Sequence, residues 1–185
     1  MNGRMKGFAA MLGAGVILCA AAPSFGDAAA DTLFMTNAIR GNMAEVKMGE
    51  LAEQKGASES VRDFGKMLAS DHGKALKKHE DLARKKNIVV PTDVSAEQMK
   101  EHAALEKLSG RDFDQEFAAK MVDEHQKTVK MYEAEAASNG DPDIVDLAKD
   151  TLPKLREHLM TAQKLAAGES TTRTSQRTDS DRRLE

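Results

Sequence analysis

The chain has 185 residues, a formal net charge of −3 and a single cysteine. Acidic and basic residues are interspersed and nearly balanced, which argues against nucleic acid as a partner. Aromatic residues make up only 4% of the chain and there are four prolines, a composition that favours helices because strands draw on aromatic and β-branched residues. The length suits one domain with a sizeable core.

Residues 1–26 are typical of a secretory signal peptide. A short positive segment precedes an apolar run, Gly7–Ala22, and small residues allow cleavage after Gly26 or Ala30. The apolar run is short for a membrane span of about 20 residues. Cys19 lies in this run and does not follow a small residue, so lipidation is not expected. We therefore expect a periplasmic protein whose mature chain contains no thiol.

The remaining chain shows helical periodicity in four long segments. Apolar stripes predict helices over 31–55, 59–86, 111–137 and 142–167, and a capping-box sequence at Ser95 opens a short helix over 95–108. Pro153 lies inside the last helix and predicts a kink or a local break. Residues 31–167 would form the domain, and residues 168–185, rich in Ser, Thr and Arg, are expected to be a disordered tail.

The first and last pairs of long helices resemble each other. Val46-Lys47-Met48 recurs 83 residues later as Val129-Lys130-Met131, and the caps and apolar positions that follow agree with the same offset. Two related helical hairpins joined by a long connection predict an all-α fold, a four-helix bundle with a long crossover that contains the short extra helix.

Each long helix carries a polar, titratable residue on its apolar face. These residues are Glu45, His72, His125 and His158. Imidazole and carboxylate groups from facing helices are suitable ligands for Fe, Zn, Mn or Cu in a bundle core. Because buried polar groups cost free energy unless they find partners, we expect either a metal site or a structural hydrogen-bonded network.

Other residues on these helices are less direct candidates. His79 lies near the end of its helix and is expected to be a core residue, whereas Asp114 opens its helix, where a carboxylate favours the helix dipole. Asp71, Glu124 and Glu157 precede the three histidines and are expected to orient neighbouring ligands. The methionines have no clustered spacing, so we expect them to fill the core rather than bind Cu(I).

The outer face of the second long helix is basic. It carries Lys74, Lys77, Lys78, Arg84, Lys85 and Lys86. A solvated charged face near a helix C-terminus accounts for this run most simply. Docking on anionic lipid is the alternative, and it would depend on salt.

The motifs follow one another in a recognisable order: Glu45, Val61-Arg62-Asp63-Phe64, Met67, Asp71-His72, Phe113-Asp114, His125, and Leu152-Pro153-Lys154-Leu155 before His158. This succession resembles the exported bacterial domain-of-unknown-function family 4142 (DUF4142) over about residues 31–166. The resemblance implies a ferritin-like fold and an envelope location, and it carries no assigned activity. Di-iron ferritin-like proteins place Glu three residues before a ligand His. Here those positions hold Ala69, Val122 and Leu155, which argues against ferroxidase chemistry.

We therefore predict a periplasmic, ferritin-like protein that holds one transition-metal ion with Glu45, His72, His125 and His158. Its role would be metal handling or envelope stress protection. The alternative is a non-catalytic stress or interaction module in which buried histidines fix helix register. The sequence leaves open whether the site is catalytic, and it indicates no protein partner.

Overall fold

The computed structural model describes residues 25–169. The described residues form five α-helices: α1 (Phe25–Lys55), α2 (Glu59–Lys85), α3 (Ala96–Glu106), α4 (Gly110–Ala136) and α5 (Pro142–Ala166). The predicted all-α bundle with a short helix in its crossover is confirmed. The predicted signal peptide, 1–26, and tail, 168–185, lie outside the described residues except for two residues each.

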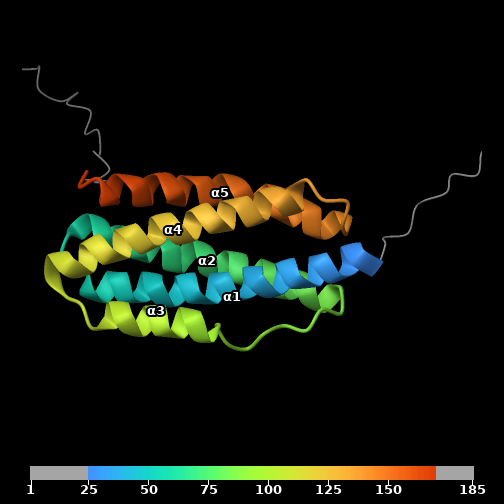
Figure 1. Cartoon of the computed structure of the whole chain (residues 1–185), viewed down its shortest axis with the longest axis horizontal. Helices are drawn as coiled ribbons and strands as arrows, with labels where there is room; N and C mark the ends of the chain where they lie inside the picture. The colour runs from blue at the N-terminus through green and yellow to red at the C-terminus, as the bar shows by residue number, and fades with distance from the viewer. Residues whose placement is uncertain (1–24, 170–185) are drawn as a thin grey trace, which may run out of the picture.

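The four long helices pair as two antiparallel hairpins, α1 with α2 and α4 with α5 (Figure 1). The connection from α2 to α4 returns along the length of the bundle and places α3 beside α1 (Figure 1). The crossover therefore brings the two hairpins face to face. As a result, side chains from all four long helices can meet in one interior.

Polar caps set the beginnings of three helices. The Ser58 side chain accepts a hydrogen bond from the Val61 backbone, Ser95 and Gln98 form the predicted capping box, and Asp141 caps α5. Of the kink or local break expected at Pro153, the break does not occur, since α5 continues through Pro153 without interruption, and the kink stays a prediction. Pro153 is exposed, so its missing N–H affects the solvent side of the helix, where distortion is best tolerated.

The apolar core has two parts. One cluster is built around Ile39, Tyr132 and Ile144, and the other around Phe64 and Phe117. On each of α2, α4 and α5, residues of one cluster precede the predicted ligand histidine and residues of the other cluster follow it. The bundle therefore buries these imidazoles at a middle level, with hydrocarbon on both sides.

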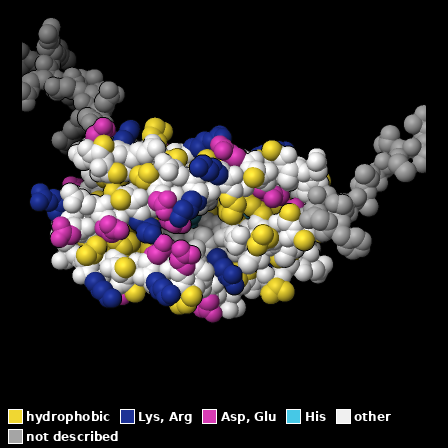
Figure 2. All heavy atoms as spheres, in the orientation of Figure 1, with side chains coloured by type: hydrophobic (Ala, Val, Ile, Leu, Met, Phe, Trp, Pro, Cys, Tyr) yellow, Lys and Arg dark blue, Asp and Glu magenta, His cyan; other side chains and the backbone are white. Residues whose placement is uncertain are grey.

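Acidic and basic side chains alternate over the surface shown in Figure 2. On the basic face of α2, Lys74 pairs with Asp71, and Arg84 pairs with Glu80. Among the described residues, no helix has both the length and the apolar character needed to cross a membrane. Docking of the α2 face on lipid stays a prediction.

Candidate metal centre

Three histidines from three helices converge in the core. Among the described residues, His72 of α2, His125 of α4 and His158 of α5 each offer one ring nitrogen, and these nitrogens lie within 4.8 Å of one another. The ring centroids are 5.1 to 5.6 Å apart. The side chains are almost fully buried, with exposed fractions of 5%, 1% and 1%.

The His72 ring is oriented by Asn42 of α1. The Asn42 amide donates to the Ala38 carbonyl at 2.8 Å, which leaves its oxygen facing His72. Nδ1 of His72 lies 2.9 Å from that oxygen. Because an amide oxygen only accepts, Nδ1 carries the proton and Nε2 keeps its lone pair.

The other two rings are fixed in the same way by acceptors. Nδ1 of His125 donates to the Met121 carbonyl at 3.0 Å, one helical turn earlier. Nε2 of His158 lies 3.2 Å from a carboxylate oxygen of Asp71 on α2. The protons therefore sit on these nitrogens, and Nε2 of His125 and Nδ1 of His158 keep lone pairs.

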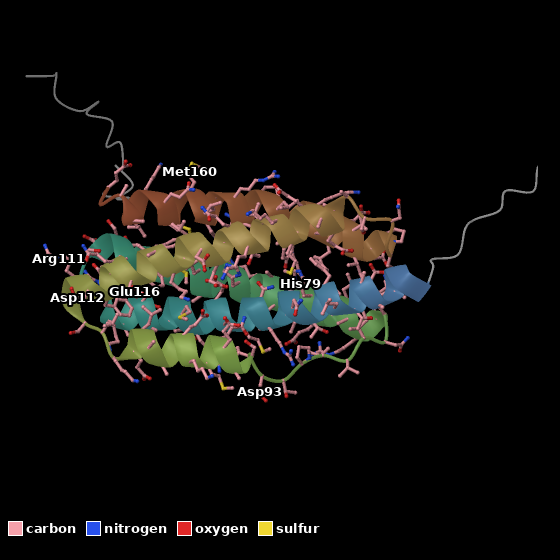
Figure 3. The ribbon with its side chains drawn as sticks, in the orientation of Figure 1. His79, Asp93, Arg111, Asp112, Glu116 and Met160 are labelled. Carbon is pink, nitrogen blue, oxygen red and sulfur yellow. The ribbon has the colours of Figure 1, made fainter. Side chains whose placement is uncertain are left out.

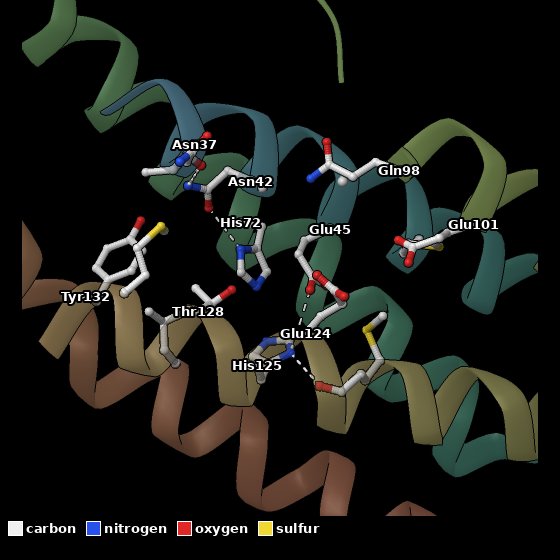
Figure 4. Close-up of a pocket in the computed structure, with 17 residues that line it drawn as sticks. Asn37, Asn42, Glu45, His72, Gln98, Glu101, Glu124, His125, Thr128 and Tyr132 are labelled. Carbon is white, nitrogen blue, oxygen red and sulfur yellow. Dashed lines mark hydrogen bonds and ion pairs between the residues drawn. The ribbon is translucent and has the colours of Figure 1, made fainter. Parts of the chain in front are cut away.

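All three remaining ring nitrogens are buried and have no hydrogen-bond partner among the described residues. They are also the nitrogens that the tautomers leave unprotonated. Figure 4 shows His72 and His125 facing each other across the interior. Three buried lone pairs without a donor are costly, and a cation placed among them would satisfy all three at once.

Burial keeps the three rings neutral. Desolvation lowers the pKa of His72 well below its usual range, and the neighbouring histidines add to this. The pKa of His125 falls to about 4, chiefly through burial and then through His158. Burial also lowers the pKa of His158, against the opposing pull of Asp71. Protons therefore do not compete for these nitrogens at neutral pH.

Glu45 lies beside this group. Its Oε1 is 3.6 Å from Nδ1 of His125, the protonated nitrogen of that ring, and its Oε2 is buried without a partner. Burial, helped by Glu124, raises the pKa of Glu45 to about 8. At pH 7 the contact therefore joins a protonated carboxyl to a neutral imidazole and is not a salt bridge.

The donor set suits a transition metal. Imidazole is a good ligand for Zn, Cu, Fe and Ni, whereas Mn prefers oxygen. Bonds of about 2 Å place two ligand nitrogens roughly 3.4 Å apart, so the rings would need to close in by at most about 1.4 Å. Asp71 supplies the carboxylate–imidazole contact that commonly orients a ligand histidine.

Two other polar residues on the inner faces are engaged elsewhere. His79, which is labelled in Figure 3, is fully buried. It donates from Nδ1 to the Ala75 carbonyl and accepts from the Tyr132 hydroxyl, both at 2.8 Å. It is a satisfied core residue, as predicted. The Asp114 carboxylate accepts from the backbone of Ala57 and Ser58 at 2.8 Å, so it anchors the turn before α2.

The acids predicted to orient ligands behave differently from one another. Asp71 contacts His158, on the facing helix rather than its neighbour in sequence. Glu157 pairs with Lys154 at 2.7 Å on the surface. Glu124 lines a pocket next to Glu45 and pairs with Lys127.

Asn42 was not among the predicted site residues. The 83-residue offset between the hairpins could have indicated it, because it makes Asn42 the counterpart of His125. An amide on the inner face of α1, one turn before Glu45, was a second signal.

Fold and geometry together define a helical bundle with a buried cluster of three histidines. The chain belongs to the family DUF4142, a domain of unknown function, whose family model matches residues 19–165. The family resemblance drawn from the motifs is thereby confirmed. No curated protein matches the chain.

Two solved structures share the fold. One is the crystal structure of a DUF305 fragment from Deinococcus radiodurans, with a TM-score of 0.66 and 14% identity. The other is CopM in the Cu(I)-bound form, with a TM-score of 0.64 and 17% identity. Each match covers 75% of this chain and 96% of the other.

Proposed function

We propose that this protein binds one transition-metal ion through His72, His125 and His158, and that it serves in metal handling. The observation that carries the proposal is the set of three buried ring nitrogens, each left with a lone pair and no hydrogen-bond donor. A structural network would pair these atoms, as the core pairs those of His79. The shared fold with the Cu(I)-bound form of CopM supports a metal role.

We propose that Glu45 is the fourth residue of this site, beside the three histidines. Its Oε1 faces the His125 ring and its Oε2 has no partner. Glu45 would act on the ion either by moving to bind it or through the His125 ring that it contacts. Imidazole donors favour Cu, Zn or Fe over Mn.

The test is metal binding by the full mature chain. We expect anaerobic purification followed by elemental analysis to give one ion per chain, or titration of metal-free protein with Cu(I), Zn(II) and Co(II) to saturate at one. His72→Ala and His158→Ala should each lower affinity at least a hundredfold. His79→Ala, also a buried histidine, and His102→Ala should leave it unchanged. The proposal would be refuted if the protein is purified without metal and the wild type and all four variants then bind added metal with equal affinity.

An envelope location is the second part of the proposal. It rests on the sequence of residues 1–26 and on no structural observation. Cell fractionation and the N-terminal sequence of the mature protein test it. A soluble periplasmic chain beginning near Asp27 is expected, and an intact Met1 in the cytoplasm would contradict it.

A further inference from the structure

A pocket opens between α1 and α4 and reaches two of the three histidines. Its volume is about 50 Å³, room for a few water molecules. His72 and His125 line it, together with Glu45, and Gln98 of α3 forms part of its wall. Figure 4 shows these side chains around the opening. Two of the three imidazoles of the centre therefore border a space large enough to hold water.

Gly41 leaves one wall of the pocket without a side chain. Gly41 lies on the inner stripe of α1 and lines the pocket, yet a Cβ built on it would meet nothing within 4 Å. Glycine inside a helix lowers stability relative to alanine. At a position with free space, alanine would stabilise the helix and leave the pocket open, whereas a larger apolar residue such as leucine would fill it. The glycine therefore costs stability and keeps the space open.

Thioethers and carboxylates line this space. Met48 and Met121, both buried, and Met131 contribute sulfur-bearing side chains, and Glu45 and Glu124 contribute carboxyl groups. Of the other methionines of the long helices, Met35 is fully buried in the core and Met43 packs against it. Met67 and Met160 are exposed, and Figure 3 shows Met160 on the outer side of α5. Met48 and Met121 belong to the core and Met131 packs against it, as predicted, and all three also line the pocket.

A second hollow adjoins the first on the side of α3. It shares Ala44, Met48 and Gln98 with the pocket, and it adds Met99 and His102. Met99 is 53% exposed. Thioether and imidazole groups therefore extend from the surface at α3, past Met48, to the histidines in the core.

We propose that this Gly41 pocket, defined by Gly41, Glu45, Met48, Met121, Glu124 and Met131, is the path by which the ion reaches the three histidines, and that its cargo is Cu(I). The proposal deepens and rests on the proposed metal site. Thioethers are soft ligands that select Cu(I), and imidazoles also bind copper. Weak thioether contacts along the path would pass the ion inwards to the three nitrogens.

The path is tested by the rate of loading. Cu(I) is supplied to metal-free full-length protein as its complex with a coloured chelator, and transfer is followed by stopped-flow absorbance. Gly41→Leu should fill the pocket without touching a ligand, and should slow transfer at least tenfold while the equilibrium affinity changes less than threefold. Gly41→Ala and Gly73→Ala are the matched controls, since both replace a helical glycine and leave the pocket open. Loading of Gly41→Leu at the wild-type rate would overturn the path.

The cargo is tested by comparing two ions. Met48→Leu, Met121→Leu and Met131→Leu, combined, conserve volume and should be tolerated in the core. This variant should take up Cu(I) at least fivefold more slowly than the wild type and Zn(II) at the wild-type rate. Equal rates for both ions, or equal slowing of both, would overturn the Cu(I) assignment. Failure of the wild type to bind any ion would instead refute the metal site, and this inference with it.

Discussion

His72 and His79 lie two turns apart on the same face of α2, and both are buried, yet they differ in what their rings contact. Both nitrogens of His79 have partners, the Ala75 carbonyl and the Tyr132 hydroxyl. His72 has a partner for one nitrogen and none for the other, and its ring lies 5.1 to 5.6 Å from those of His125 and His158. Position and burial therefore do not separate a structural histidine from a candidate ligand, whereas the hydrogen bonds of each ring nitrogen do.

The three-histidine cluster and the surroundings of His79 should differ most in the stability that the protein gains from bound metal. An ion present at a thousand times its dissociation constant would stabilise the native state by about 4 kcal/mol. His79→Leu should keep this gain, and His125→Leu should lose nearly all of it. Thermal unfolding with and without Cu(I) or Zn(II) measures both. A gain that survives in His125→Leu would mean that the ion binds elsewhere.

The same pair of variants should behave in the opposite way without metal. His79→Leu leaves the buried Tyr132 hydroxyl without its partner and should cost about 2 to 3 kcal/mol. His125→Leu removes an unpaired buried nitrogen and should be neutral, or stabilising by about 1 kcal/mol. Urea unfolding in the presence of a chelator tests this. Equal losses in both variants would indicate that the three histidines are structural.

Glu45 should give the metal-free centre a pH dependence opposite in sign to that of the buried histidines. Its pKa is raised from 4.5 to about 8, so the folded state holds a proton that the unfolded chain has already lost. The stability of the wild type relative to Glu45→Gln should therefore fall by about 2 kcal/mol as the pH rises from 6.5 to 8. The buried histidines, whose pKa values are lowered, raise the stability of both proteins over the same window, because the unfolded imidazoles are still partly protonated near pH 6.5.

Urea unfolding across this pH range, in a chelator, measures the slope. Glu45→Gln cannot lose a proton, so its stability should show only the rise with pH that the histidines cause. A constant difference in stability between the wild type and Glu45→Gln from pH 6.5 to 8 would show that the Glu45 carboxyl is ionised or solvated in the folded state.

The smallest expected effect concerns the orientation of His158. Asp71→Ala removes the acceptor that holds the proton on Nε2, and should weaken metal binding about tenfold. Glu157→Ala is the matched control, because Glu157 adjoins His158 in sequence but pairs with Lys154 on the surface. Titration with Zn(II) compares the two. Equal effects would remove Asp71 from the centre.

Helical periodicity was enough to predict the bundle and the residues that enter its core. Apolar stripes with steps of three and four define one face of each helix, so Glu45, His72, His125 and His158 could be placed inside. The same rule tells which way a side chain leaves its helix, but not which of its polar atoms meets which partner. It could not say that three ring nitrogens would be left unpaired, or that Glu45 would face the protonated side of His125.

Other features depend on contacts between helices distant in sequence. Asn42 meets His72 only because α1 and α2 pack at this register, and Asp114 of α4 caps the turn before α2. Gly41 fits the inner stripe as a small residue, and only the packed structure shows that nothing fills the space in front of it. Pro153 predicted a kink or a local break, and the break does not occur because tertiary packing of α5 outweighs one missing hydrogen bond.

The crossover divides the three histidines between the two hairpins. His72 belongs to the hairpin of α1 and α2, and His125 and His158 belong to that of α4 and α5. Contacts are much denser within each hairpin than between them, so the seam where the hairpins meet is the place where the domain would open first. An ion held by all three rings would cross-link that seam, and hydrogen exchange along it would slow on loading.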